Sequence, residues 1–313
     1  MRTGEAILLL APSPARQRIL EIAPLAPGAV HRVKAVTECS AGKAVNAARV
    51  LSRLGIRSQL LAFTERGKGK RLSQEMGGPR VSCVSLPCPL RICTTLVEPE
   101  GRTTEMVEPQ ADIGPEACRE FMKRSLAMIP KARAVLMAGS LPPGFPPDAY
   151  RQWVRCCRLH GVPSLADVHG ERLCSLLDSP PDALKPNLSE LVELLGEAPR
   201  GKRNTESFLK AAFAEIYRKG KGWLFLSEGS RGAWSLLNGE CLHIPAPSVR
   251  VKNAIGAGDS AAAVMTSLMD KGLPHVLMAS LAVKIASLSC TTLLPGELPE
   301  EAVKVYCDTL PLQ

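Results

Sequence analysis

The sequence predicts an α/β fold in which helices cover a mainly parallel central sheet and a small β-sheet lid is added to that body. The first observation is the alternation of amphipathic segments with short apolar runs from about residue 115 onward, which is typical of parallel sheets covered by helices. The second is a pair of hairpin-like segments nearer the N-terminus that do not fit this alternation. The third is the size of the chain, since 313 residues of which 45% are hydrophobic can form one large domain with a substantial core.

The N-terminal part of the chain combines strands, one helix and the two hairpins. Residues 6–10 form a short apolar run, which predicts a central strand. Residues 44–54 carry apolar side chains at helical spacing, and Gly55 ends this helix. The next strand is expected at residues 59–63. The hairpins are expected to pair residues 19–22 with 30–36 and residues 90–97 with 103–107.

The C-terminal part repeats a helix followed by a strand. Helices are expected at residues 115–127, 147–160, 171–177 and 205–219. The strands that follow them are expected at residues 134–138, 163–167, 183–185 and 222–227. After an extended run at residues 241–244, the small apolar residues 260–269 predict a buried helix. Ligands of such sheets bind at the carboxyl ends of the strands, so we expect the site there.

The composition restricts the class of protein. A net charge of +9 favours anionic ligands, either phosphorylated metabolites or nucleic acid. No dense run of Lys and Arg with interleaved aromatic residues occurs, so we expect no nucleic-acid partner. Eleven cysteines without a convincing secretory signal indicate reduced thiols and a cytoplasmic location, and the absence of a Cys-x-x-Cys pair argues against a metal–thiolate site. No apolar run is long enough to span a membrane.

Residues 253–260, NAIGAGDS, form a loop that opens the last predicted helix. Gly256 and Gly258 bracket Ala257 and allow the backbone to approach a ligand closely. The first N–H groups of a helix have no intrahelical partner, and together with the helix dipole they form an anion site. Asp259 lies inside this site and can accept a proton. An anion site beside a carboxylate base suits phosphoryl transfer to an alcohol, whereas the alternative is a simple N-cap.

Four other segments accompany this loop in a fixed order, namely residues 41–49 (AGKAVNAAR), 139–144 (GSLPPG), 185–191 (KPNLSEL) and 227–233 (SEGSRGA). Together the five segments resemble those of the ribokinase-like (PfkB) carbohydrate kinases. The similarity is to the branch that phosphorylates sugar phosphates: 1-phosphofructokinase, tagatose-6-phosphate kinase and the minor 6-phosphofructokinase. The resemblance implies a three-layer α/β/α body forming a single kinase domain over residues 1–313, with lid segments at about residues 12–38 and 88–109.

The resemblance also implies an ATP- and Mg²⁺-dependent kinase and assigns roles to residues. Asp259 would take the proton from the acceptor hydroxyl, and the amides of Gly256, Ala257 and Gly258 would form the anion hole. Asn187 and Glu190 correspond to the family's metal-organising pair, although a capping pair is the alternative. The nucleotide-binding positions are Lys185, Asn187, Ser227, Gly229, Gly232 and Ser289. For two of these residues the alternative is a role without function: Lys185 could be a surface lysine, and Ser289 could serve only in helix packing.

The acceptor positions implied by the resemblance are Gln17, Gly42, Lys43, Asn46, Arg91 and Ser140. A sugar phosphate needs cationic donors at its phosphate and amides or carboxylates at its hydroxyls. Lys43, Arg91 and Ser140 suit the first task and Asn46 the second. The lid is expected to close over the acceptor and, as in this family, to form a contact between two copies of the chain.

Three departures from the family pattern concern the acceptor side. The branch usually begins with Asn-Pro-Ala-x-Asp, but residues 13–17 here are SPARQ, which places Gln17 where the aspartate would stand. Ala41 and Ala44 replace two glycines, and residues 64–67 (TERG) replace a glycine-rich turn. Two alternatives therefore stay open: a kinase of an unphosphorylated sugar or nucleoside, and a non-catalytic protein that binds a sugar phosphate or nucleotide.

Overall fold

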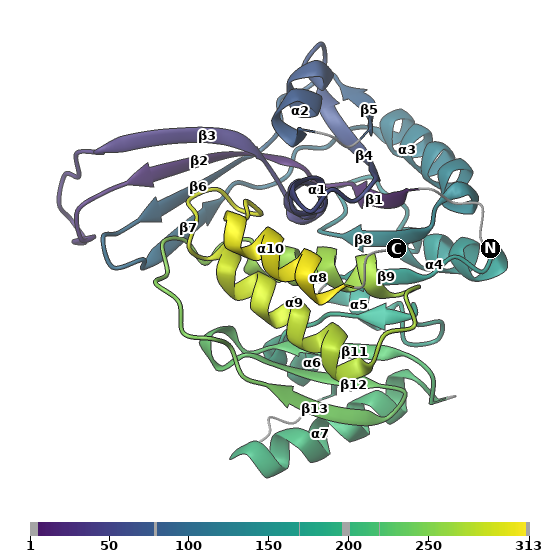
Figure 1. The fold of residues 1–313 in the computed structure, drawn as a ribbon. Helices are drawn as coiled ribbons and strands as arrows, with labels where there is room; N and C mark the ends of the chain where they lie inside the picture. Colours follow the sequence, from purple (N-terminus) through teal and green to yellow (C-terminus); the bar gives the residue numbers. More distant parts are fainter. Residues whose placement is uncertain (1–5, 78–79, 169, 196–200, 219, 311–313) are drawn as a thin grey trace.

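A computed structural model describes residues 6–77, 80–168, 170–195, 201–218 and 220–310 of the chain (Figure 1). The larger sheet in these ranges has nine strands. From one edge to the other they are β13 (Glu240–Ile244), β12 (Ala233–Leu237), β11 (Trp223–Ser227), β10 (Ala183–Leu184), β9 (Ser164–Asp167), β8 (Ala134–Ala138), β1 (Ile7–Ala11), β4 (Ser58–Glu65) and β5 (Arg80–Leu86). All neighbours from β11 to β5 are parallel, and only β12 and β13 are antiparallel to their neighbours.

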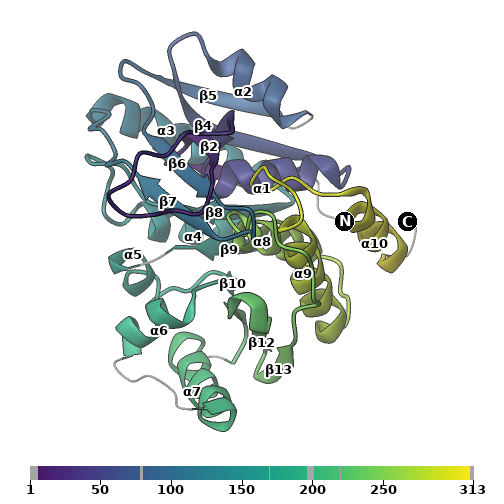
Figure 2. The same cartoon turned by 90° about the vertical axis from the view of Figure 1, so that its left-hand side faces the viewer.

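Helices cover both faces of this sheet because the buried strands are apolar on both faces. In β1, for example, Ile7 and Leu9 pack into one core and Leu8 and Leu10 into the other. The first core is covered by α1 (Lys43–Arg53), α2 (Gly69–Met76), α8 (Ala257–Leu268), α9 (His275–Ser289) and α10 (Glu300–Thr309). The second is covered by α3 (Pro115–Met128), α4 (Ala149–Leu159), α5 (Glu171–Cys174), α6 (Leu188–Leu195) and α7 (Gly201–Ile216). Figure 2 shows the three layers side by side, which confirms the predicted α/β/α body.

A second, smaller sheet projects from one side of the body (Figure 1). Its order is β3 (Ala35–Ala41), β2 (Ala15–Glu21), β6 (Ile92–Val97) and β7 (Thr103–Val107). The pairs β2–β3 and β6–β7 are antiparallel, as the two predicted hairpins require, and β2 and β6 join them in parallel. We call this sheet the lid.

Several predicted elements differ from the structure in their bounds, and two of these differences have a clear physical reason. The strand expected at residues 30–36 begins only at Ala35, because β2 ends at Glu21, opposite Ala35, and leaves the earlier residues without a strand to pair with. The helix expected at residues 171–177 ends at Cys174. There the backbone tightens into turns in which Leu176 N–H donates to Leu173 and Leu177 N–H to Cys174, so the apolar spacing continues without an α-helix.

All eleven cysteines are free thiols. Within the described ranges, every helix is either too short or too polar to cross a lipid bilayer.

Candidate active site

Asp259 lies in the first turn of α8, where the sequence places it. The helix begins after Gly256, whose left-handed backbone (φ 89°) favours glycine. A side chain there would also collide with the loop at Pro295, since a Cβ atom would lie 2.9 Å from that ring. Nδ2 of Asn46, on α1, donates to Oδ2 of Asp259 at 2.7 Å. The predicted base therefore contacts one of the predicted acceptor residues.

A second carboxylate, Asp167, ends strand β9 beside this pair. Its side chain is buried and forms ion pairs with two lysines, Lys43 Nζ at 2.6 Å and Lys185 Nζ at 3.0 Å. Lys43 is the first residue of α1, and Lys185 follows β10. Lys185 is only 6% exposed, which rules out the alternative of a surface lysine.

This environment shifts the pKa values of the two carboxyl groups in opposite directions. Burial and the nearby charge of Asp167 raise the pKa of Asp259 to about 6, against the lowering effect of the Asn46 hydrogen bond and the two lysines. Asp259 keeps some contact with solvent, but the protein around it still disfavours its charged form. Burial also acts to raise the pKa of Asp167, yet Lys185 and Lys43 outweigh it and hold that pKa below its ordinary value. Asp259 can thus gain and lose a proton near neutrality, whereas Asp167 stays charged.

The start of α8 and Lys185 lie against each other. A Cβ atom on Gly258 would lie 3.2 Å from Lys185 Nζ, so the glycine leaves room for the ammonium group beside the helix N-terminus. The N–H of Ala257 makes a long hydrogen bond of 3.3 Å to the Ala254 carbonyl, which a stronger acceptor could replace. Positive charge and helix N–H groups therefore converge where an anion would be expected.

A cavity of about 600 Å³ opens next to this helix start. Its volume falls in the range of small-molecule sites. Among the predicted residues, Ser227, Gly229, Gly232, Ala257 and Gly258 line it. Residues 246–254, α9 and Phe225 of β11 contribute to the remaining walls.

Ser289, predicted to bind the nucleotide, is not among these lining residues. It is 5% exposed, and its hydroxyl donates to the Ala286 carbonyl of its own helix at 2.8 Å. Ala286 and Ser287 of the same helix, and Cys290 directly after it, line the cavity instead. Ser289 therefore does not face the cavity, because the side of α9 that does so carries Ala286 and Ser287.

Asn187 and Glu190 form a reciprocal cap at the start of α6. The N–H of Asn187 donates to Glu190 Oε2 at 2.8 Å, and the N–H of Glu190 donates to Asn187 Oδ1 at 2.9 Å. This is the capping-box pattern, the alternative that the sequence left open. No cluster of three or more His, Cys, Asp or Glu suited to a metal occurs in the described part of the chain. The oxygen donors of Asn187 and Glu190 would suit Mg²⁺ that keeps its waters and binds phosphate, but not a protein cage.

Arg91 and Ser140 meet at a third point, around Ser13. Arg91 Nη2 donates to Ser13 Oγ at 2.9 Å, and the hydroxyls of Ser140 and Ser13 are 3.0 Å apart. Ser13 follows β1 and Ser140 follows β8, so both lie at carboxyl ends of parallel strands. Within the described residues, the buried Nε of Arg91 has no hydrogen-bond partner. A guanidinium with an unused donor beside two hydroxyls is chemically suited to an anionic oxygen.

Gln17 occupies the inner part of the lid. It is 2% exposed, and its Nε2 donates to Thr95 Oγ1 on β6 at 2.6 Å. Thr95 is paired with Glu105 on β7, and both Gln17 and Thr95 form hydrogen bonds with the Glu105 carboxylate. The side chain of Glu105 is exposed, but partial desolvation by the neighbouring strands raises the pKa of its carboxyl above the ordinary value, against these hydrogen bonds and the charge of Arg91. The lid thus carries a carboxylate two strands away from the position where the family has its aspartate.

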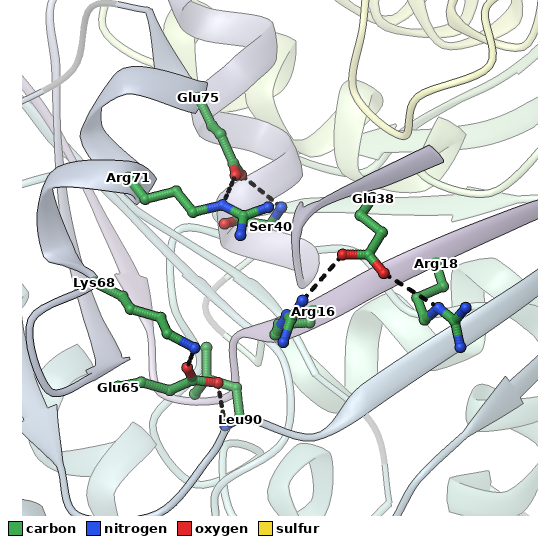
Figure 3. A network of polar contacts seen from close by, with 9 residues as sticks. All are labelled: Arg16, Arg18, Glu38, Ser40, Glu65, Lys68, Arg71, Glu75 and Leu90. Atoms are coloured by element: carbon green, nitrogen blue, oxygen red, sulfur yellow. Dashed lines mark hydrogen bonds and ion pairs between the residues drawn. The ribbon is translucent and has the colours of Figure 1, made fainter. Parts of the chain in front are cut away.

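Charged side chains hold the base of the lid against the body (Figure 3). Glu75 of α2 accepts from the N–H of Ser40 on β3 at 2.7 Å and pairs with Arg71. Glu65, in the turn that departs from the family pattern, pairs with Lys68 and accepts from the Leu90 N–H at 3.1 Å. A small cavity of about 40 Å³ lies among these residues. Residues 64–67 therefore bind the backbone directly before Arg91 through the hydrogen bond between Glu65 and Leu90.

The predicted acceptor residues lie in several separate sets of contacts rather than in one cluster. Asn46 contacts Asp259, Arg91 and Ser140 share Ser13, and Gln17 faces Thr95. Lys43, predicted to hold the phosphate of the acceptor with Arg91, pairs with Asp167 near the predicted base. Gly42 caps α1 with φ 116°, and a Cβ atom there would lie 3.0 Å from the Ser13 carbonyl oxygen. Gly42 therefore lets α1 approach the loop after β1.

Asp167 and Glu105 are site residues that the sequence reasoning missed. A signal existed for Asp167, because it is the acid that ends a predicted parallel strand, where ligands of such sheets bind. Glu105 lay in a predicted hairpin strand, but its position opposite Thr95 depends on the pairing of strands that only the structure provides.

Comparison with known proteins is consistent with this geometry. Residues 15–301 match the sequence model of the pfkB family of carbohydrate kinases. Phosphofructokinase-2 from Escherichia coli in complex with fructose-6-phosphate superimposes with a TM-score of 0.83 at 22% identity, covering 97% of this chain and 99% of that one. The tetrameric inhibited form of that protein gives 0.82 over the same shares, also at 22% identity. A "possible 1-phosphofructokinase" from Thermotoga maritima gives 0.81 at 20% identity, covering 97% and 98%. At these identities the structures establish a shared fold.

Proposed function

The chain belongs to the pfkB family of carbohydrate kinases and is an ATP-dependent sugar kinase, and from this premise we propose that it phosphorylates a hydroxyl group of a sugar phosphate. The observation that carries the proposal is the position of Asp259. It lies between the mouth of the 600 Å³ cavity, which Ala257 and Gly258 line, and the acceptor residue Asn46. A base at this point can deprotonate an acceptor hydroxyl facing a nucleotide phosphate.

The transferred phosphoryl group would lie between the start of α8 and the two lysines. The N–H groups of Gly256, Ala257 and Gly258, together with Lys43 and Lys185, supply donors and positive charge where negative charge develops. Asp167 holds both lysines, so their ammonium groups are oriented before the substrates arrive. Mg²⁺ bound to the nucleotide phosphates, with Asn187 and Glu190 holding its waters, would supply further neutralisation of charge.

The group formed by Arg91, Ser13 and Ser140 supports an acceptor that already carries a phosphate. The unused Nε donor of Arg91 and the two hydroxyls can bind phosphate oxygens. Gln17 and Glu105 on the lid would then accept from the hydroxyl groups of the sugar. The shared fold with a phosphofructokinase solved with fructose-6-phosphate is consistent with this acceptor class, in which fructose-1-phosphate, fructose-6-phosphate and tagatose-6-phosphate are the candidates.

The lid also supports association of two copies of the chain. Val36 on β3 and Met106 and Val107 on β7 are about half exposed, and both strands are edges of the lid sheet. Exposed apolar edge strands favour pairing with another chain. We propose a homodimer formed through the lid.

The test is a screen for ADP release with ATP and Mg²⁺ across phosphorylated and free sugars. We expect turnover with at least one ketohexose phosphate and much lower kcat/KM with the matching free sugar. Equal use of free and phosphorylated sugars would contradict the acceptor class and favour a kinase of unphosphorylated sugars. Sugar binding by calorimetry without ADP release from any acceptor would identify a non-catalytic binding protein.

A further inference from the structure

Arg49 of α1 lies one helical turn after Asn46 and has no role in the site described so far. Its guanidinium donates through Nη1 to Asn46 Oδ1 at 3.4 Å and to the Pro295 carbonyl, and through Nη2 to the Ser40 carbonyl at 2.7 Å. These acceptors belong to α1, to the loop before α10 and to strand β3 of the lid. The Pro295 and Ser40 carbonyls therefore hold the guanidinium beside the side-chain oxygen of Asn46.

The contact with Asn46 matters because a side-chain amide has two different ends. The oxygen can only accept hydrogen bonds and the nitrogen can only donate them. An ionised Asp259 can only accept, and a guanidinium can only donate. Arg49 at the oxygen and Asp259 at the nitrogen thus require the same orientation of the Asn46 amide. Asn46 is 5% exposed, so little water is available to replace either partner.

We propose that Arg49 is a positioning residue for the base: by holding the carbonyl end of Asn46, it keeps the Asn46 N–H group on the Asp259 carboxylate. This inference rests on the proposed function, in which Asp259 deprotonates the acceptor. Without Arg49, the amide is free to rotate and to present its oxygen to Asp259. Two oxygens facing each other disfavour the charged carboxylate, so the base would ionise only at higher pH.

The other charged groups that face Asp259 do not depend on Arg49. They are Asp167 from β9, which raises the pKa of Asp259, and Lys43 and Lys185, which lower it. Both lysines are held by Asp167. A shift in the ionisation of Asp259 in an Arg49 variant would therefore report on the Asn46 amide rather than on a rearrangement of this ion-pair group.

Arg53 provides a matched control one turn further along α1. Its Nε donates to the Leu298 carbonyl at 3.4 Å, so it also connects α1 to the segment before α10, but it has no contact with Asn46. Arg49→Met and Arg53→Met remove the same charge from the same helix. Only the first removes a donor from the amide that faces the base.

The experiment is the pH dependence of kcat/KM, measured with the best acceptor of the wild-type enzyme. The wild type is expected to lose activity below about pH 6, the pKa of Asp259. We call the fall in kcat/KM at low pH the acid limb of the profile. In Arg49→Met we expect the midpoint of this limb to rise by about one pH unit, the effect of about one hydrogen bond, whereas Arg53→Met should have the same midpoint as the wild type. Arg49→Lys keeps a donor and should lie between the wild type and Arg49→Met.

The result that overturns the inference is an Arg49→Met limb that coincides with the wild-type one, or an equal shift in Arg53→Met. Thermal unfolding of both variants checks that they are folded. If Arg49→Met does not fold, Arg49→Lys against Arg53→Lys gives the same comparison, and coinciding limbs again overturn the inference. Failure of the proposed function is a different result, since the wild type would then release no ADP with any acceptor or would use free and phosphorylated sugars equally.

Discussion

Two carboxylates of the site, Asp167 and Asp259, have the same chemistry but different surroundings. Asp167 has two ammonium groups within 3.0 Å, which keep it ionised in spite of its burial. Asp259 has a single amide donor at 2.7 Å and the negative charge of Asp167 nearby. One carboxylate therefore organises positive charge, and the other exchanges a proton near neutral pH.

Asp259→Asn should stabilise the protein in a pH-dependent way. The pKa of Asp259 is about 6 when folded, against about 3.9 for an unfolded aspartate, so ionisation in the folded state costs stability. The cost is absent below about pH 4, grows between pH 4 and 6, and stays constant above that range. We expect equal stability of variant and wild type at pH 4 and a gain for the variant of up to about 3 kcal/mol at pH 7.5. Urea unfolding at both pH values measures this difference.

Asp167→Asn is the control for this measurement, because we expect it to lower the free energy of unfolding where Asp259→Asn raises it. Its folded pKa is lowered, so it contributes stability above its unfolded pKa that is lost as the pH falls. Removing it leaves Lys43 and Lys185 without their shared carboxylate, and we expect a loss of about 3 kcal/mol or more at pH 7.5. If both variants were destabilised equally at this pH, the contrast between the two carboxylates would be wrong.

The site lies where the carboxyl ends of parallel strands meet the N-termini of two helices. Ser13, Ser140, Asp167 and Lys185 end or follow parallel strands, and Lys43 and Asp259 stand in the first turns of α1 and α8. This arrangement was predictable, because apolar runs and glycine loops mark where such strands end and such helices begin. Three of the unpredicted elements have weak patterns: α2 buries only Leu72 and Met76, β5 is an edge strand with polar residues, and β12 is a short strand directly after a glycine turn.

Arg91→Ala should weaken the binding of a phosphorylated acceptor and leave the nucleotide side unchanged. Charge-assisted hydrogen bonds contribute about 1.5–3 kcal/mol, so we expect KM for the sugar phosphate to rise by roughly 10- to 100-fold. Arg18→Ala is the matched control, because Arg18 lies on the same lid but pairs with Glu38 at its exposed surface. Steady-state kinetics with varied sugar and varied ATP distinguish the two. An unchanged preference for phosphorylated over free sugar in Arg91→Ala would remove the phosphate role.

At the scale of the whole molecule, the site depends on contacts between distant parts of the chain. Asn46 and Asp259 are 213 residues apart in sequence, and Lys43 and Asp167 are 124 apart. Local patterns indicate the residue types and the elements that carry them, so candidates for the base and the anion site could be named from the sequence. They do not indicate which charges become neighbours, so the pairing of Lys43 with Asp167 could not be predicted.

The proposed dimer predicts that a charge on the lid separates the two copies. Met106 is 52% exposed on an edge strand of the lid, and Met106→Glu would place a carboxylate in an apolar contact. Leu159→Glu is the control, since Leu159 is 79% exposed on the body at the end of α4. Sedimentation velocity should show a dimer for the wild type and Leu159→Glu, and a monomer or weaker dimer for Met106→Glu. A monomeric wild type would exclude the lid contact.

Asp259 is proposed to take the proton of the acceptor hydroxyl, and the turnover of Asp259→Asn is the decisive test of this role. Asparagine keeps the shape of the side chain and can still accept from Asn46, but it cannot act as a base. With the best acceptor and saturating ATP at pH 8, we predict a loss in kcat of roughly 10³-fold or more, with ATP binding by calorimetry unchanged. A turnover within about tenfold of the wild type would show that Asp259 is not the base.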